Sequence, residues 1–247
     1  PGVGENLQDH YVARFCCRAK DVETFNERAR GVRLGWEIFR YAFKRTGLLT
    51  TAPGNVSASL KVMPGVATPD VQFAFAPASY VEGQLGVLDK FPGMTCGIWQ
   101  HRPASRGSIH MASTDPEVQP TIRPNYLSDR IDQETIVGGL RKARELFAQP
   151  TLAKFVDVET VPGPDVQTDD ELLDFARRTG STVFHPIGTC KMGTDLMAVV
   201  DPELRMHGLN GLRVVDASVM PLMPSANTNA AVLMIAEKAA DMIKAAN

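Results

Sequence analysis

Cysteine is scarce in this 247-residue chain, and its placement offers little disulfide or metal chemistry. The four cysteines are Cys16, Cys17, Cys96 and Cys190, two of them adjacent and none in a C-x-x-C arrangement. Neighbouring cysteines rarely bridge each other, because disulfide geometry strains the peptide between them. So few thiols argue against a disulfide framework and against a zinc ribbon, and they favour a reducing, cytoplasmic location. We expect no metal site.

The sequence also lacks an excess of charge and any long apolar run. Its 26 basic and 28 acidic residues are interspersed and leave a formal net charge of -2, so no nucleic-acid partner is indicated. No apolar stretch approaches the roughly 20 residues that span a bilayer, and the first residues do not have the layout of a signal peptide. We therefore expect no transmembrane segment.

A starting methionine is missing too. The chain begins at Pro1 within the glycine-rich stretch PGVGENLQDH, which is typical of a structured loop. We expect that an N-terminal portion is absent or belongs to another chain. The 44% hydrophobic content is nevertheless sufficient for one or two folded domains.

Alternating apolar residues predict several strands. Val71, Phe73 and Phe75 alternate with Gln72 and Ala74, which is the period of a half-buried strand over residues 70–76. Further strands are predicted over residues 11–17, 94–100 and 107–112. The last two, together with residues 71–75, suggest an antiparallel sheet.

Three helices are predicted before residue 180. Over residues 23–43, apolar side chains fall three or four positions apart, which predicts a helix with one buried stripe: Val32, Trp36, Phe39 and Phe43. A second helix is predicted over residues 129–147. Thr168 and the three acids that follow it predict a capped helix over residues 169–178.

The C-terminal region has the order strand, acid, loop and helix. Residues 212–215 are predicted as a strand, Asp216 follows it, and a helix is expected over residues 230–244. This order is typical of the surroundings of a cofactor in an α/β domain. The fold class is therefore α/β (α+β), with an antiparallel sheet in its middle part.

His185 is the leading candidate for chemistry, within STVFHPIGTCKMG. A residue before proline favours an extended backbone, so the imidazole is presented from a constrained position. A histidine that only fills the core is the alternative from the residues alone, and metal ligation is disfavoured because no second ligand stands at a suitable spacing. The other histidines, His10, His101, His110 and His207, are assigned to structure or surface.

Asp216 and the SANTN run at 225–229 are the other polar candidates. Asp216 is placed either to accept hydrogen bonds from a ribose or ribityl hydroxyl or simply to cap a turn. The SANTN run precedes an apolar helix, so backbone amides and the positive end of the helix dipole point at whatever lies there, and capping of the helix is the simpler role. Gly2-Val3-Gly4 does not qualify as a dinucleotide loop, because no strand precedes it.

Four segments, in order PGVGENLQDH, HRPASRG, FHPIGTCKMG and the run from VVDPELR to EKAADMI, together resemble the glucose-methanol-choline (GMC) family of FAD-dependent oxidoreductases. The similarity is greatest to its choline and alcohol dehydrogenase branch. It implies the C-terminal portion of such an enzyme. Residues 1–10 would form a loop over FAD, 11–180 a substrate-binding domain, and 181–247 the active-site segment that completes the FAD-binding domain.

The resemblance also implies roles for individual residues. His185 matches the active-site histidine that acts on the substrate hydroxyl as a base or orients it, and Asn227 matches the second active-site position. Cofactor contacts are implied for Gly4, Asn6, Asp216, Ala217, Thr228 and Asn229. Trp99 and Gln100 are expected to contact substrate, from their position at the end of a strand.

The implied reaction is oxidation of an alcohol to an aldehyde or ketone, with hydride transfer to flavin N5. The family's glycine-rich ADP loop is absent from these residues, so the expected partner is the missing N-terminal half, and the chain alone is expected to be inactive. A lyase or photodecarboxylase on the same fold, and an inert fragment, are the alternatives. The sequence does not indicate which alcohol is oxidised.

Overall fold

The computed structural model describes residues 1–52, 54–81, 84 and 86–246 of the chain. The chain divides into two compact units, each formed by segments that are distant in sequence. Unit 1 comprises Pro1–Tyr11, Gln100–Gln133 and Thr182–Asn247, and unit 2 comprises Val12–Trp99 and Glu134–Ser181. These units reflect packing, whereas the expected domains were drawn by function, so the domain assignment stays a prediction.

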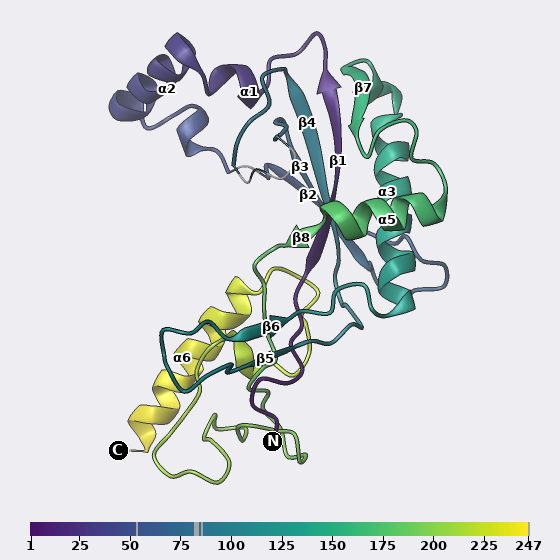
Figure 1. Ribbon diagram of the computed structural model, residues 1–247. Coiled ribbons are helices and arrows are strands. Elements are labelled where there is room, and N and C mark those ends of the chain that lie inside the picture. Colours follow the sequence, from purple (N-terminus) through teal and green to yellow (C-terminus); the bar gives the residue numbers. More distant parts are fainter. Residues whose placement is uncertain (53, 82–83, 85, 247) are drawn as a thin grey trace. The chain divides into compact units, whose positions relative to one another are not determined.

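Unit 2 is built on an antiparallel sheet (Figure 1). Its strand order is β2-β3-β4-β1-β7, and the short β8 also pairs with β1. The strands are β1 (Tyr11–Ala19), β2 (Val56–Leu60), β3 (Val71–Ala76), β4 (Gly93–Gln100), β7 (Val156–Val161) and β8 (Ser181–Thr182). The predicted strands over 11–17, 70–76 and 94–100 are confirmed, and Val71 and Phe73 are buried as their alternation requires.

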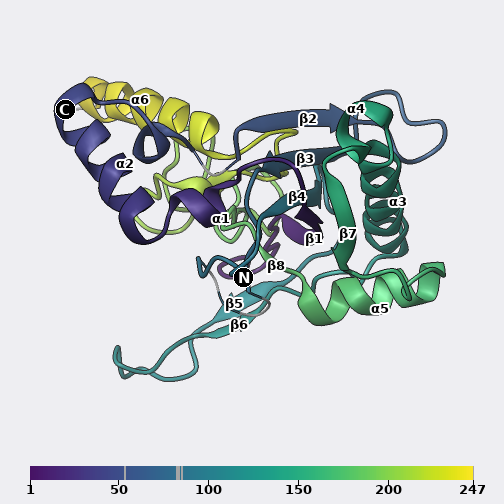
Figure 2. The same ribbon diagram turned by 90° about the horizontal axis from the view of Figure 1, so that it is seen from above.

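The core of unit 2 lies where α3 (Arg130–Phe147) packs on the sheet, and Figure 2 shows this helix running along one side of it. The Phe147 ring lies 4.7 Å from that of Phe15 on β1 and 6.0 Å from that of Phe75 on β3. On the same helix, the Arg144 guanidinium pairs with Glu159 of β7 at 2.7 Å. The helix predicted over 129–147 is therefore confirmed.

A second helix of unit 2 follows the predicted cap. In α5 (Asp169–Thr179), the Thr168 hydroxyl accepts the N–H of Glu171 at 3.3 Å, and the Glu171 carboxylate accepts the N–H of Thr168 at 2.8 Å. This reciprocal pair is a capping box, which satisfies N–H groups that the helix itself cannot. The short α4 (Pro150–Ala153) precedes β7.

The helix predicted over residues 23–43 is two helices, and its apolar stripe is exposed rather than buried. The chain forms α1 (Phe25–Arg28), then α2 (Gly31–Lys44), followed by the short 3-10 helix η1 (Leu48–Thr50). Val32 is 92% exposed and Trp36 60% exposed, whereas Glu37 on another side is buried. Glu37 binds Arg28 and Arg40 and accepts the N–H of Leu48. These contacts hold the Glu37 carboxylate in its buried position.

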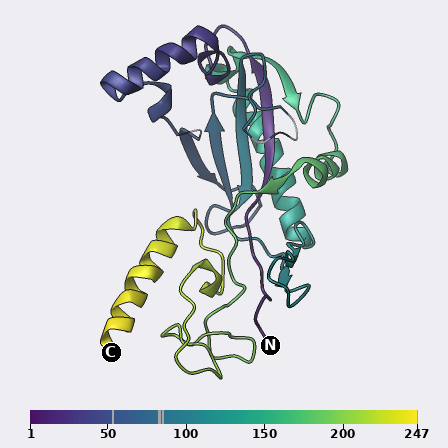
Figure 3. The same ribbon diagram turned by 60° about the vertical axis from the view of Figure 1, so that its left-hand side comes forward.

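Unit 1 consists mainly of coil packed against α6 (Asn229–Ala245), as Figure 3 shows for the yellow helix and the green segment before it. Ile235 and Ala239 of α6 enter a buried cluster with residues of that segment: Ile187, Val199, Val200, Leu204, Val219, Met220 and Met223. The helix predicted over 230–244 is confirmed. The short 3-10 helix η2 (Ala217–Val219) lies within the same cluster.

Two strand predictions in unit 1 need correction. The one over 107–112 corresponds to β5 (Ser108–His110), which pairs with β6 (Thr121–Arg123) in a separate two-stranded sheet. Residues 212–215 form no strand, and only Arg213 makes an isolated bridge, to Arg205. A strand requires a neighbour with which to form a hydrogen-bond ladder, and apolar patterning alone does not supply one.

The structure agrees with the expected class of mixed helices and antiparallel sheet. Within its described residues, no helix is long and apolar enough to cross a bilayer.

Candidate active site

The four segments that carry the family resemblance meet within unit 1. Leu7 of the first segment and Gly107 of the second each donate a backbone N–H to the carbonyl of the other at 2.9 Å. Gln8 makes the same reciprocal pair with Ile187 of the third segment, at 3.1 and 2.9 Å. The Gln8 side-chain oxygen also accepts the N–H of Met223 in the fourth segment at 3.1 Å. The first segment therefore joins the other three.

The buried Asp9 carboxylate accepts three hydrogen bonds where these segments meet. One carboxylate oxygen accepts the backbone N–H of His185 at 2.9 Å. The other accepts the hydroxyls of Tyr126 and Thr182, each at 2.5 Å. Burial and the bond to Asp9 raise the pKa of Tyr126, so that phenol keeps its proton and continues to donate. Asp9 thus fixes the backbone that carries His185.

The His185 imidazole is held separately, by His10. The Nδ1 atoms of the two rings lie 2.9 Å apart, and the rings meet edge to face with centroids at 5.1 Å. The other ring nitrogen of His10, Nε2, lies 2.9 Å from the backbone oxygen of His101. His10 is completely buried, whereas His185 is half-buried. His185 is the more accessible end of the pair.

Burial keeps both imidazoles neutral near pH 7. It lowers the pKa of His10 from 6.5 to about 4, against a raising effect of the His101 carbonyl. It also lowers the pKa of His185, and the nearby Asp9 carboxylate opposes this in part. A neutral ring has one bare nitrogen, which is able to accept a proton. The pair therefore has the charge state that a general base requires.

The second predicted catalytic residue, Asn227, lies in the same unit but makes no hydrogen bond to His185 in the described chain. Its side chain is exposed just before α6. Thr228 is the buried N-cap residue of that helix, yet its side chain makes no capping bond, and Asn229 is exposed at the first helical position. The amides at this helix terminus are therefore available to an acceptor from outside the helix.

Asp216 is found in the simpler of its two predicted roles. Its Oδ1 accepts the N–H of Ser218 at 2.7 Å and so caps η2. The carboxylate is nonetheless exposed, and Ala217 packs against the apolar cluster of unit 1. A cofactor contact of either residue stays a prediction.

Gly4 and Asn6 both serve to dock the first segment. Gly4 has a φ of 84°, and a Cβ at this position would clash with the carbonyl oxygen of Ile109. The Asn6 amide donates to the carbonyls of Gly188 and Pro221, each at 3.3 Å. These positions have a structural reason for their residue types, and their predicted contact with FAD stays a prediction.

Trp99 and Gln100, the predicted substrate contacts, end β4 but fall in different units. Trp99 is buried in unit 2, and its indole N–H has no hydrogen-bond partner among the described residues. Gln100 is half-buried in unit 1. Their role in substrate binding stays a prediction.

Sequence reasoning missed the supports of His185. His10 was assigned to structure or surface, and it is indeed buried, but its contact with His185 went unrecognised, as did the roles of Asp9, Tyr126 and Thr182. The Asp9-His10 pair lies within the first segment that carries the family resemblance, and this was the available signal. Contacts across such a separation in sequence leave no local periodicity.

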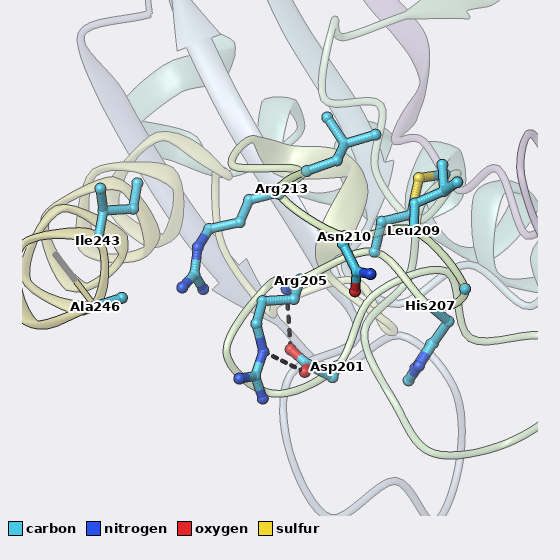
Figure 4. A pocket seen from close by; sticks show the side chains of 12 residues that line it. Asp201, Arg205, His207, Leu209, Asn210, Arg213, Ile243 and Ala246 are labelled. Carbon is cyan, nitrogen blue, oxygen red and sulfur yellow. Dashed lines mark hydrogen bonds and ion pairs between the residues drawn. The ribbon is translucent and has the colours of Figure 1, made fainter.

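A pocket of about 840 Å³ lies elsewhere in unit 1 (Figure 4). Its lining includes the Asn210-Gly211 turn, Arg213, and the Arg205 side chain, which pairs with Asp201 at 2.7 Å. None of the predicted site residues lines it. The described residues also contain no group of three side chains suited to hold a metal ion.

Comparison with known proteins shows a family and its relatives. A family model described as GMC oxidoreductase matches residues 103–236. The chain is 41% identical to the alcohol dehydrogenase [acceptor] of Pseudomonas putida, over 98% of the chain and 44% of that protein. It is 40% identical to the mitochondrial choline dehydrogenase of Homo sapiens, over 99% of the chain and 41% of that protein. The chain thus spans under half the length of these relatives.

Two solved oxidase structures are similar to this chain in fold. A pyridoxine 4-oxidase from Mesorbium loti is 27% identical, with a TM-score of 0.78 over 98% of the chain and 43% of the oxidase. A formate oxidase of Aspergillus oryzae RIB40, studied for the modification of its FAD, has a TM-score of 0.90 over 100% of the chain and 48% of the oxidase. At 24% identity, the latter likeness concerns the fold alone. Because the family model matches more than half of its residues, the chain belongs to the GMC oxidoreductase family.

Proposed function

We propose that this chain is the catalytic-residue-bearing part of an FAD-dependent enzyme that oxidises an alcohol to an aldehyde or ketone. The similarity to an alcohol dehydrogenase and a choline dehydrogenase supports an alcohol as substrate. FAD, when bound, supplies the acceptor for the hydride that leaves the alcohol carbon. Activity then requires the part of the enzyme that corresponds to the remaining length of these relatives.

The observation that carries the proposal is the neutral, half-buried imidazole of His185, fixed at its backbone and at its ring. Burial holds its pKa below the ordinary value, so the ring is unprotonated at neutral pH and has a bare nitrogen that is able to receive a proton. Removal of the hydroxyl proton by His185 raises electron density on the alcohol oxygen and favours departure of the hydride. A positioned base of this kind contributes about 10² to 10⁴-fold to rate.

Asn227 is proposed to orient the substrate oxygen. Its exposed amide offers both a donor and an acceptor and does not titrate, so it holds the oxygen without competing for the proton. It stands one residue before the N-cap of α6, whose free amides favour negative charge nearby.

The hydrogen-bond donors and acceptors of unit 1 fit a flavin cofactor. The uncapped start of α6 at Thr228 and Asn229 supplies N–H groups, and the exposed Asp216 carboxylate is an acceptor for hydroxyls. Gly4, Asn6 and Ala217 are proposed to line the same cofactor, and Trp99 and Gln100 to contact substrate. Cytoplasmic localisation also stays a proposal.

Anaerobic flavin reduction tests the function. In the complete flavoprotein, choline or a primary alcohol should bleach the oxidised-flavin absorption, and His185→Ala should slow the bleaching by about 10²-fold or more. His207→Gln is the matched control, because this exposed imidazole contacts the backbone oxygen of Gly193 and, among the described residues, no predicted site residue. Failure of every alcohol to bleach the flavin would favour a lyase or photodecarboxylase, and an unchanged rate in His185→Ala would remove His185 from the chemistry.

A further inference from the structure

The contact between His10 and His185 determines which nitrogen of His185 is bare. The Nε2 atom of His10 lies 2.9 Å from the carbonyl oxygen of His101. A carbonyl oxygen only accepts hydrogen bonds, so this nitrogen carries a hydrogen and donates it. The direction of the bond between His10 and His101 is therefore fixed, because the backbone carbonyl of His101 can only accept.

The second bond follows from the charge of His10. This ring is completely buried, and burial lowers its pKa to about 4, so it carries a single hydrogen at neutral pH. That hydrogen is on Nε2, which leaves Nδ1 as an acceptor. The Nδ1 atom of His185 lies 2.9 Å from it and must donate.

We infer that His10 is a positioning residue that holds His185 as the Nδ1–H tautomer and leaves Nε2 of His185 as the proton acceptor. The inference rests on the proposed role of His185 as the base. When Nε2 takes the hydroxyl proton, Nδ1–H still donates to His10, so the same bond stabilises both the neutral and the charged ring. No proton passes on to His10.

The groups around the two rings support separate roles for Asp9 and His10. Asp9 is the acidic group beside both rings, but its carboxylate oxygens accept the His185 backbone N–H and the two hydroxyls of Tyr126 and Thr182. The remaining titratable neighbour of His10 is His101, which opposes a charge on it. Asp9 therefore places the main chain of His185, and His10 orients its ring.

Two substitutions of His10 separate its two bonds. In His10→Gln the longer amide reaches the position of Nε2, so it keeps a donor for the His101 carbonyl but loses the acceptor for His185. In His10→Asn the shorter amide lies near the position of Nδ1, so its oxygen keeps the acceptor but the bond to His101 is lost. Both variants keep a polar group of limited size in the buried site.

The direct readout is the ring-nitrogen NMR signal of His185, in the complete flavoprotein labelled with ¹⁵N-histidine and assigned by comparison with His185→Gln. The unmodified protein should show His185 protonated at Nδ1 and bare at Nε2. An Nε2–H tautomer in the unmodified protein overturns the inference, and this outcome needs no variant to fold.

The kinetic readout is anaerobic flavin reduction by an alcohol as a function of pH. In His10→Gln, His185 should lose the Nδ1–H tautomer, and flavin reduction should be slower by about tenfold or more, with an altered apparent pKa of the rate. In His10→Asn, His185 should keep the Nδ1–H tautomer and most of the rate. Equal rates and equal tautomers in His10→Gln and the unmodified protein would overturn the inference. Failure of the proposed function is distinct, since it would show as a rate unchanged in His185→Ala, whatever the tautomer.

Discussion

Asp9 and His185, separated by 176 positions in the chain, are joined by a hydrogen bond of 2.9 Å from the His185 backbone N–H to the buried Asp9 carboxylate. The bond connects the first and the third of the segments that carry the family resemblance. It restrains the backbone at a residue that precedes proline, where the chain is already extended. The candidate base is thereby attached to a buried carboxylate of unit 1.

Replacing the Asp9 carboxylate tests this attachment. Asp9→Asn keeps the shape but presents an amide N–H₂ to groups that donate, so we expect a loss of about 2 kcal/mol or more in the free energy of unfolding. Flavin reduction should slow by about tenfold or more, because the base is no longer held in place. Urea denaturation and stopped-flow absorbance measure the two effects.

Asp132 provides the matched control for this variant. It is buried to a similar degree, and its carboxylate accepts two backbone N–H groups, from Ala104 and Ser105, each at 2.8 Å. Asp132→Asn should therefore lose similar stability without slowing flavin reduction in the folded fraction. If the two variants reduced flavin at the same rate, Asp9 would be a structural residue only.

A charge placed at Asn227 tests the helix-terminus argument. Asn227→Asp should slow flavin reduction by about tenfold or more, because a carboxylate there opposes the negative charge that develops on hydride transfer. Asn210→Asp adds the same charge at an exposed turn of unit 1 and should leave the rate unchanged. Faster reduction in Asn227→Asp would contradict the argument.

The buried His10 imidazole predicts a dependence of stability on pH. Its pKa is lowered from 6.5 to about 4 in the folded protein, so between these values the unfolded chain binds more protons than the folded one. The free energy of unfolding should therefore fall as the pH is lowered from 6.5 to about 4, by up to about 3 kcal/mol from this group. Urea denaturation across this range measures the slope.

His10→Gln serves as the comparison for the pH dependence. The variant has no ionisable group at this position, so its slope between pH 6.5 and 4 should be smaller than that of the unmodified protein. The half-buried His185 contributes in the same direction, because burial also lowers its pKa. Identical slopes in the two proteins would show that His10 is not the group that titrates.

Much of the secondary structure could be predicted from the sequence, because the signals are local. The capping box at Thr168 and Glu171 involves residues three positions apart. The apolar spacing of residues 131–146 predicts one side of α3, and on that side Ile136, Leu140 and Ala143 are buried whereas Ile131 is 48% exposed. His185 was identified in the same way, from its place before a proline and from the similarity of its segment to a family.

Other features depend on what lies across from a segment. The apolar stripe of α2 at Val32 and Trp36 indicates an amphipathic helix, but periodicity does not state which side faces the core. The apolar residues 212–215 likewise suit a strand, and no neighbouring strand within the described residues pairs with them.

The sequence by itself indicated α3, α5 and α6 and the cap of α5, since each follows from residues a few positions apart, and the resemblance of its segments indicated the candidate base. Only the tertiary structure decided how that base is supported. His10 and Asp9 are adjacent in the chain, yet one binds the ring and the other the backbone of a residue far along the chain. The physical reason is that a hydrogen bond depends on distance in space, and folding brings these groups within 2.9 Å.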